Sequence, residues 1–261
     1  MLIYTLLFTL INKYPESNKY IDMFYIWLSY LIKNSGLLEE DTVIILLDEA
    51  TMEQLNSNEA LSLLVENIPF TLQFQTIPRP SSVQAGILER YAIDRVSSPF
   101  TLFLDIDVLV LNNIKKSLLP PPANSILVMP EGELLGDNYA FDLVENSDET
   151  KNCCGFTAGW FAFTPGEGVK EFFKKSADDY LLHKTQTKYT EQSFFNKYVY
   201  LSKWKKSIDV NIYLIHSNTM PNNEYSYSHE LFMNYCGEVG NASAHFVKTL
   251  TMLCLDFIRS K

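Results

Sequence analysis

Two aspartates, Asp105 and Asp107, stand one residue apart within an apolar run that covers residues 101–111. Because side chains two apart on a strand point to the same side, a continuous strand would turn both carboxylates one way. Two like charges beside a core are costly unless they are paired or metal-bound. The spacing therefore suits a divalent-cation site at the carboxyl end of a strand, where open α/β sheets bind ligands. A solvated strand end is the alternative, and a D-x-D pair alone favours that alternative.

Two arginines precede this run on a helix predicted over residues 82–96. The guanidinium groups of Arg90 and Arg95 could bind diphosphate oxygens, which suit their planar fork of donors. They could equally form surface salt bridges with Glu89 and Asp94. The sequence leaves both interpretations open.

Polar groups that suit a ligand site also occur later in the chain. A strand predicted over residues 156–163 contains Gly159, and a strand glycine often marks close backbone approach to a ligand. A helix predicted over residues 190–201 has Glu191 and Gln192 in its first turn, where Gln192 could also be merely a first-turn helix residue. His245 is a candidate metal ligand with a structural histidine as its alternative. Among other catalytic patterns, the sequence contains no G-x-S-x-G, phosphate-loop or H-E-x-x-H motif.

The elements that must position these residues alternate in type along the chain. Periodicity predicts strands and helices in the pattern of a mostly parallel sheet with helices on both faces, in a single domain. The predicted strands cover residues 2–9, 42–47, 70–75, 101–111, 125–129, 156–163 and 207–215, and the predicted helices 17–34, 52–66, 82–96, 166–182 and 190–201. Between them, residues 131–150 are acidic and irregular, which predicts a mobile loop near an acceptor.

Composition limits the classes of partner. The chain of 261 residues has a net charge of −10, which argues against nucleic acid because phosphate binding needs a basic surface. Its four cysteines form no C-x-x-C pair, which indicates reduced thiols and a cytoplasmic location. The apolar start, residues 1–11, lacks the basic and small residues of a signal peptide and is too short to span a bilayer. We therefore expect no transmembrane segment.

The D-x-D region resembles that of glycogenin-like glycosyltransferases with the GT-A fold. Residues 92–114, AIDRVSSPFTLFLDIDVLVLNNI, are similar to the family's metal-binding stretch Y-D-x-V-L-Y-L-D-A-D-x-L-V-L-x-N-I. Three later stretches match family motifs in the same order: FTAGWFAF at 156–163, TEQSFFNK at 190–197 and HFV at 245–247. Each motif alone is weak, but their order and spacing are fairly specific. The resemblance implies a GT-A, Rossmann-like fold with a nucleotide-binding half over residues 1–111 and an acceptor and donor-sugar half over 112–261.

The resemblance also implies roles for individual residues. Asp105, Asp107 and His245 would bind Mn²⁺ or Mg²⁺, and Glu191 and Gln192 would lie beside the anomeric centre as catalytic residues. The residues that would bind the nucleotide or donor sugar are Phe8, Thr9, Tyr20, Arg90, Asp105, Ile106, Asp107, Thr157, Ala158, Gly159 and Lys248. The chain departs from the family at Thr157, where asparagine is usual, and after His245, where a glycine is missing and Lys248 comes early.

These observations predict a metal-dependent transfer of sugar from a nucleotide-diphosphate sugar, with UDP as the expected nucleotide. Retention of configuration is implied by the resemblance only. The acceptor, whether glycan, protein or small molecule, is not determined, and a homodimer is left open. Two other functions remain: a nucleotidyltransferase acting on a sugar phosphate, which normally needs a glycine-rich and basic loop after the first strand, and a non-catalytic module that binds sugar nucleotides.

Overall fold

A computed structural model gives the fold and describes residues 1–9, 19–57, 59–66, 68–96, 98–183, 186, 190–215, 218–219 and 231–234. Its contacts divide the chain into two compact units. The first unit comprises the described residues of Met1–Gly86, Leu104–Leu119 and Ser217–Lys261, and the second those of Ile87–Phe103 and Pro120–His216. The predicted single-domain organisation stays a prediction.

The first unit contains the parallel strands predicted at the start of the chain. β1 (Leu2–Leu7) pairs with β2 (Thr42–Leu47), and β2 pairs with β3 (Thr71–Thr76), all in parallel. β1 and β2 are buried along most of their length, as expected for apolar strands covered on both faces. The first three predicted strands are confirmed, with ends that differ by one or two residues.

Helix α1 (Lys19–Asn34) is buried around most of its circumference from Ile21 to Leu31, in agreement with its apolar sequence. Gly36 follows with φ of +71°, a left-handed conformation that glycine adopts at a helix end without strain. The single helix predicted over 52–66 is wrong: α2 (Glu49–Asn56) ends at the cap Ser57, and α3 (Glu59–Val65) follows.

The continuous strand predicted over residues 101–111 is also wrong. β4 (Thr101–Leu104) ends before Asp105, and β5 (Val108–Val110) begins after Asp107. The Val108 N–H donates to the Asp105 carbonyl at 2.9 Å and closes a turn that holds both aspartates. The sequence did not reveal the turn because Ile106, between the aspartates, is apolar and buried, as a residue of a continuous strand would be.

β5 belongs to a separate small sheet in the first unit. It pairs antiparallel with β10 (Phe232–Asn234), which pairs in parallel with β9 (Asn218–Thr219). The short helix α5 (Ile114–Ser117) follows β5, and the Ile114 N–H donates to the Ser35 carbonyl beyond the end of α1.

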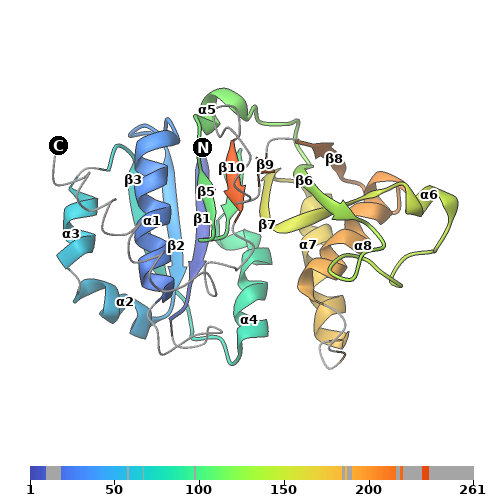
Figure 1. Cartoon of the computed structure of the whole chain (residues 1–261), viewed down its shortest axis with the longest axis horizontal. Helices are drawn as coiled ribbons and strands as arrows, with labels where there is room; N and C mark the ends of the chain where they lie inside the picture. Colours follow the sequence, from blue (N-terminus) through green and yellow to red (C-terminus); the bar gives the residue numbers. More distant parts are fainter. Residues whose placement is uncertain are drawn as a thin grey trace. The chain divides into compact units, whose positions relative to one another are not determined.

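In the second unit, helices pack against an antiparallel strand pair. β6 (Ser125–Glu133) pairs antiparallel with β7 (Cys154–Thr164) and in parallel with β8 (Asn211–Leu214). α7 (Glu167–His183) and α8 (Glu191–Lys203) lie side by side, and α8 packs against β7 (Figure 1).

The large sheet has the strand order β3-β2-β1-β4-β7-β6-β8 and is mixed and mostly parallel, which confirms the predicted α/β fold class.

Three predictions for the second unit need correction. The helix predicted over 82–96 is replaced by α4 (Val83–Leu88) and two 3₁₀ turns, η2 (Glu89–Tyr91) and η3 (Ile93–Arg95). The strand predicted over 207–215 is confined to β8. The irregular stretch 131–150 contains the end of β6 and the start of α6 (Asp148–Lys151), and its apolar residues pack with Cys153 and Tyr200.

No helix among the described residues has both the length and the apolar character needed to cross a bilayer.

Phe161 tests the core of the second unit. Its side chain is fully buried, with ring centroids 5.0 Å from Phe103 and 4.9 Å from Phe173. We expect Phe161→Ala to lower the free energy of unfolding by about 3–5 kcal/mol, measured by urea denaturation, because a cavity replaces these contacts. Leu182→Ala, at a side chain that is 77% exposed, is the control and should cost less than about 0.5 kcal/mol. Equal effects would contradict the packing described.

Candidate functional site

The peptide group of Ala158 on β7 is held by two of the predicted site residues. The Ala158 N–H donates to Oε1 of Gln192 at 2.8 Å, and Nη1 of Arg90 donates to the Ala158 carbonyl at 2.9 Å. Next to it, the Gly159 N–H donates to Oγ1 of Thr157 at 3.1 Å. The structure therefore brings together Arg90, Gln192 and the predicted donor strand 157–159 within the second unit.

A proline explains why the Phe156 carbonyl on this strand takes a side-chain donor. Pro130 on β6 lies opposite Phe156 and has no N–H to donate across the sheet, and the register shifts on either side of it. Asn196 on α8, which is fully buried, bonds to both backbone groups of Phe156: Oδ1 accepts from the N–H at 2.6 Å and Nδ2 donates to the carbonyl at 2.8 Å. α8 is thereby fixed to β7 one turn beyond Gln192.

Arg90 is a buried arginine with several partners. It lies on η2, where its Nε donates to the Ile87 carbonyl at 3.1 Å and its guanidinium carbon lies 5.0 Å from the centre of the Phe103 ring. Its Nη1 is 3.6 Å from Oε1 of Glu191. Arg95 differs, because it forms the ion pair with Glu89 that the sequence left open as an alternative.

Glu191 and Gln192 occupy the first turn of α8. Thr190 caps this helix in an extended conformation, and its N–H donates to Oγ of Ser193 at 3.2 Å. Both ends of the Gln192 amide are engaged, since Nε2 donates to the Asn138 carbonyl at 3.2 Å. Glu191 keeps its half-buried carboxylate beside Arg90. The catalytic roles predicted for these two residues stay predictions.

In the first unit, Asp105 and Asp107 are half-buried on the turn between β4 and β5. Two carboxylates on one turn fit two ligand positions of Mn²⁺ or Mg²⁺, which prefer oxygen donors. Within the described ranges, no group of three or more His, Cys, Asp and Glu side chains could hold a metal ion. The predicted third ligand, His245, and the predicted phosphate-binding Lys248 lie outside the described residues.

The residues predicted to hold the nucleotide lie at the end of β1 and the start of α1. Phe8 and Thr9 follow β1 and are buried, and Tyr20 is half-buried in the first turn of α1. Thr9 is joined to α2, because its N–H donates to Oγ1 of Thr51 at 3.1 Å and the two hydroxyl oxygens are also 3.1 Å apart.

The sequence prediction missed a polar network at the neighbouring strand ends. Asp48 follows β2 and caps α2 by accepting from the Thr51 N–H at 2.9 Å, and its Oδ2 is 2.5 Å from Nε of Arg79. Asp48, Arg79 and the end of β3 line a pocket of about 500 Å³. An aspartate directly after a strand and before a helix is a capping pattern that the sequence did show.

The pKa of Asp48 lies below its usual range. Burial raises this pKa, but the hydrogen bonds from Thr51 and the ion pair with Arg79 together outweigh burial. The carboxylate is therefore the form that the folded first unit prefers.

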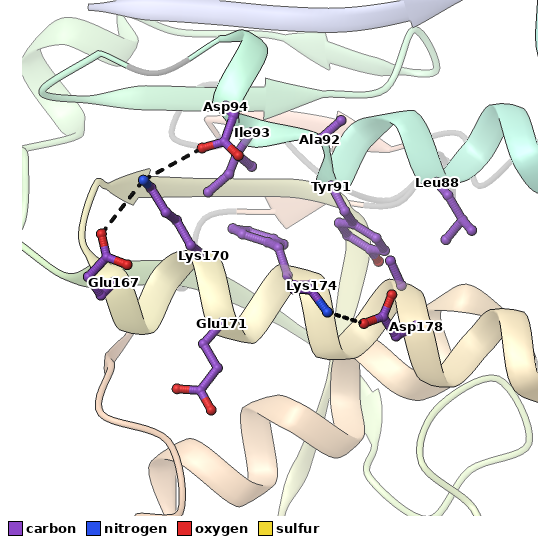
Figure 2. Close-up of a pocket in the computed structure, with 12 residues that line it drawn as sticks. Leu88, Tyr91, Ala92, Ile93, Asp94, Glu167, Lys170, Glu171, Lys174 and Asp178 are labelled. Carbon is purple, nitrogen blue, oxygen red and sulfur yellow. Dashed lines mark hydrogen bonds and ion pairs between the residues drawn. The ribbon is translucent and has the colours of Figure 1, made fainter.

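A second pocket, of about 630 Å³, lies in the second unit between η2, η3 and α7. Tyr91 and Phe173 line it together with several charged side chains. Figure 2 shows Lys170 reaching from α7 to Asp94 and Glu167, at 3.8 and 3.6 Å, while Lys174 pairs with Asp178 at 2.6 Å. Since these lysines are neutralised by neighbouring carboxylates, the pocket offers no excess positive charge to an anionic ligand.

Comparison with solved structures identifies the fold. A galactosyltransferase, LgtC, solved in complex with donor and acceptor sugar analogues, matches 96% of this chain and 95% of its own with a TM-score of 0.57 and 13% sequence identity. No protein-family profile and no curated protein matches the sequence. At this identity the likeness establishes the fold alone, and it confirms the predicted GT-A architecture.

Asp48 gives a pH-dependent test of the strand-end network. Because its pKa is lower in the folded state, its ionised form stabilises the fold above the unfolded pKa of about 3.9, and this contribution is lost as the pH falls through the folded pKa. We expect Asp48→Asn to lower the free energy of unfolding by about 1–3 kcal/mol at pH 7 and by less near pH 3, measured by urea denaturation. Asp137→Asn, at an exposed turn, is the control. If Asp48→Asn lowers the free energy of unfolding as much near pH 3 as at pH 7, this account is wrong.

Proposed function

We propose that the chain is a metal-dependent glycosyltransferase that moves a sugar from a nucleotide-diphosphate sugar, with UDP as the first candidate nucleotide. The observation that carries this proposal is the arrangement around Ala158. Arg90 and Gln192 both bond to its peptide group, and the Glu191 carboxylate lies 3.6 Å from Arg90. A buried cation and a carboxylate beside the half-buried Gly159 suit a polar, uncharged ligand such as a sugar.

The proposed reaction exchanges one bond at the anomeric carbon for another. The bond from this carbon to the diphosphate oxygen breaks, and its electron pair leaves with the diphosphate. A bond to an acceptor hydroxyl oxygen forms, and the hydroxyl proton passes to the departing diphosphate. We include retention of configuration in the proposal because the family resemblance implies it.

Asp105 and Asp107 are the residues that would hold Mn²⁺ or Mg²⁺ in the first unit, with His245 as the third ligand. Such an ion supplies Lewis acidity that neutralises the charge of the diphosphate. Phe8, Thr9 and Tyr20 are assigned to the nucleotide in the same unit. Glu191 and the strand 157–159 are assigned to the sugar, and Arg90 to holding both of them in place.

The rival functions differ in what they would release. A nucleotidyltransferase would join a nucleotide to a sugar phosphate and release pyrophosphate from a nucleoside triphosphate. A non-catalytic module would bind the sugar nucleotide without turnover. The absence of glycine from the sequence after β1, TLINKYP, argues against the first rival.

Donor hydrolysis tests the proposal directly. With a panel of nucleotide sugars, the purified protein should release free nucleoside diphosphate from at least one donor with Mn²⁺ and not with a chelator. Asp107→Ala should lower UDP affinity in the presence of Mn²⁺ by about tenfold or more in calorimetry, since one metal ligand is lost. Turnover that is independent of metal, or unchanged UDP affinity in the variant, would contradict the proposal.

Arg90 provides a second test with a matched control. Lysine keeps the charge but cannot bond to the Ile87 and Ala158 carbonyls together, because it lacks the planar fork. We therefore expect Arg90→Lys to lower kcat for donor hydrolysis by about tenfold to a hundredfold. Arg95→Lys, whose partner is Glu89, should leave kcat within about twofold of the parent. Equal effects of the two substitutions would refute a special role for Arg90.

A further inference from the structure

Tyr139 lies on a platform made by two paired glycines, Gly132 and Gly155, in the second unit. Gly132 on β6 and Gly155 on β7 are paired across the two antiparallel strands, so the positions where their side chains would stand are on the same face. A Cβ at Gly132 would lie 2.6 Å from Cε2 of Tyr139, and a Cβ at Gly155 would lie 2.5 Å from Cδ1. Both distances are too short for real atoms. The ring therefore occupies the space that the missing side chains leave.

Further contacts fix the ring and the chain around it. The Tyr139 hydroxyl donates to Oε2 of Glu131 at 3.3 Å, and the Tyr139 N–H donates to the Gly136 carbonyl at 2.9 Å. On the other side of the ring residue, the Ala140 N–H donates to the Leu134 carbonyl at 2.9 Å. The turn that carries Tyr139 is thus tied to β6 through the Tyr139 side chain, and to Leu134, the residue after β6, through its backbone.

The residue before Tyr139 connects this turn to the candidate site. The Asn138 carbonyl accepts from Nε2 of Gln192, while Oε1 of the same amide accepts from the Ala158 N–H. An amide has donors at one end and an acceptor at the other. Once the Asn138 carbonyl holds the donor end, the acceptor end must face Ala158.

We infer that Tyr139 is a positioning residue, which acts through the Asn138 carbonyl and Gln192 to hold the Ala158 peptide in the geometry that sugar transfer needs. The catalytic consequence rests on the proposed function, whereas the link from Tyr139 to Ala158 does not. In this arrangement Gln192 bonds to the protein backbone at both ends, and Glu191 is the neighbouring residue left to contact the sugar.

Hydrogen exchange at the Ala158 amide tests the link without any substrate. In Tyr139→Ala and in Gly155→Ala, the Ala158 N–H should exchange about tenfold faster or more than in the parent, the change expected when a hydrogen bond of ordinary strength is lost. Because removal of the ring relieves the overlap, the Gly155→Ala and Tyr139→Ala double variant should match Tyr139→Ala alone. In a Gln192→Met background, Tyr139→Ala should leave Ala158 exchange unchanged.

Two matched controls separate positioning from general destabilisation. Tyr139→Phe keeps the ring and should exchange as the parent does. Asp137→Asn changes an exposed side chain on the same turn and should also exchange as the parent does. If Tyr139→Ala leaves Ala158 exchange unchanged, or if Tyr139→Phe is as damaging as Tyr139→Ala, the inference is overturned. Tyr139→Ala does not overfill the platform, so it decides the matter even where Gly155→Ala fails to fold.

Kinetics then test the catalytic consequence. Tyr139→Ala should lower kcat for donor hydrolysis by about tenfold or more, while UDP affinity with Mn²⁺, which we assign to the first unit, stays within about twofold. A loss of UDP affinity equal to the loss of kcat would contradict a positioning role. If the parent protein hydrolyses no donor, the proposed function fails, and the exchange measurement still decides whether Tyr139 holds Ala158.

Discussion

Buried peptide groups need hydrogen-bond partners, and the way β7 meets this need determines where the candidate site residues of the second unit lie. Its Phe156 and Ala158 backbone groups bond to side chains of Asn196, Gln192 and Arg90. The same bonds fix the start of α8 and the 3₁₀ turn η2 against this strand. The residues that we assign to the sugar are therefore fixed by the same bonds that keep the strand satisfied.

The different roles that we propose for Arg90 and Glu191 follow from how each side chain is buried. Arg90 is enclosed among carbonyl groups, the Phe103 ring and one carboxylate, so its charge is compensated without exposure to water. Glu191 is the partly accessible member of this pair. A group that is both held and accessible suits contact with a ligand, whereas one that is held at every end suits support of its neighbours.

Periodic features of the fold could be predicted from the sequence, and features that depend on distant pairing could not. The apolar runs of β1 and β2 and the helical spacing of apolar residues in α1 predicted these elements directly. Buried residues recur with the period of the element that carries them, and their run has its length. The turn at Asp105 and Asp107 was missed because the buried Ile106 continues the apolar pattern expected of a strand. Proximity of Arg90, Gln192 and the strand 157–159 was suggested only by resemblance, and their bonds to Ala158 could not be predicted. Those bonds depend on Pro130 facing Phe156 across a shifted register, which no local pattern reveals.

Because Pro130 and Asn196 both act on Phe156, the residues tolerated at one position depend on the residue at the other. A residue with an N–H at position 130 could donate to the Phe156 carbonyl, which can accept two hydrogen bonds, and Asn196 would then be one donor of two. Proline donates nothing, so the buried carbonyl relies on Asn196, and loss of the asparagine would leave it unsatisfied at a cost of about 1–3 kcal/mol. Among related chains we therefore expect asparagine at position 196 without proline at 130, and not proline at 130 without a donor at 196.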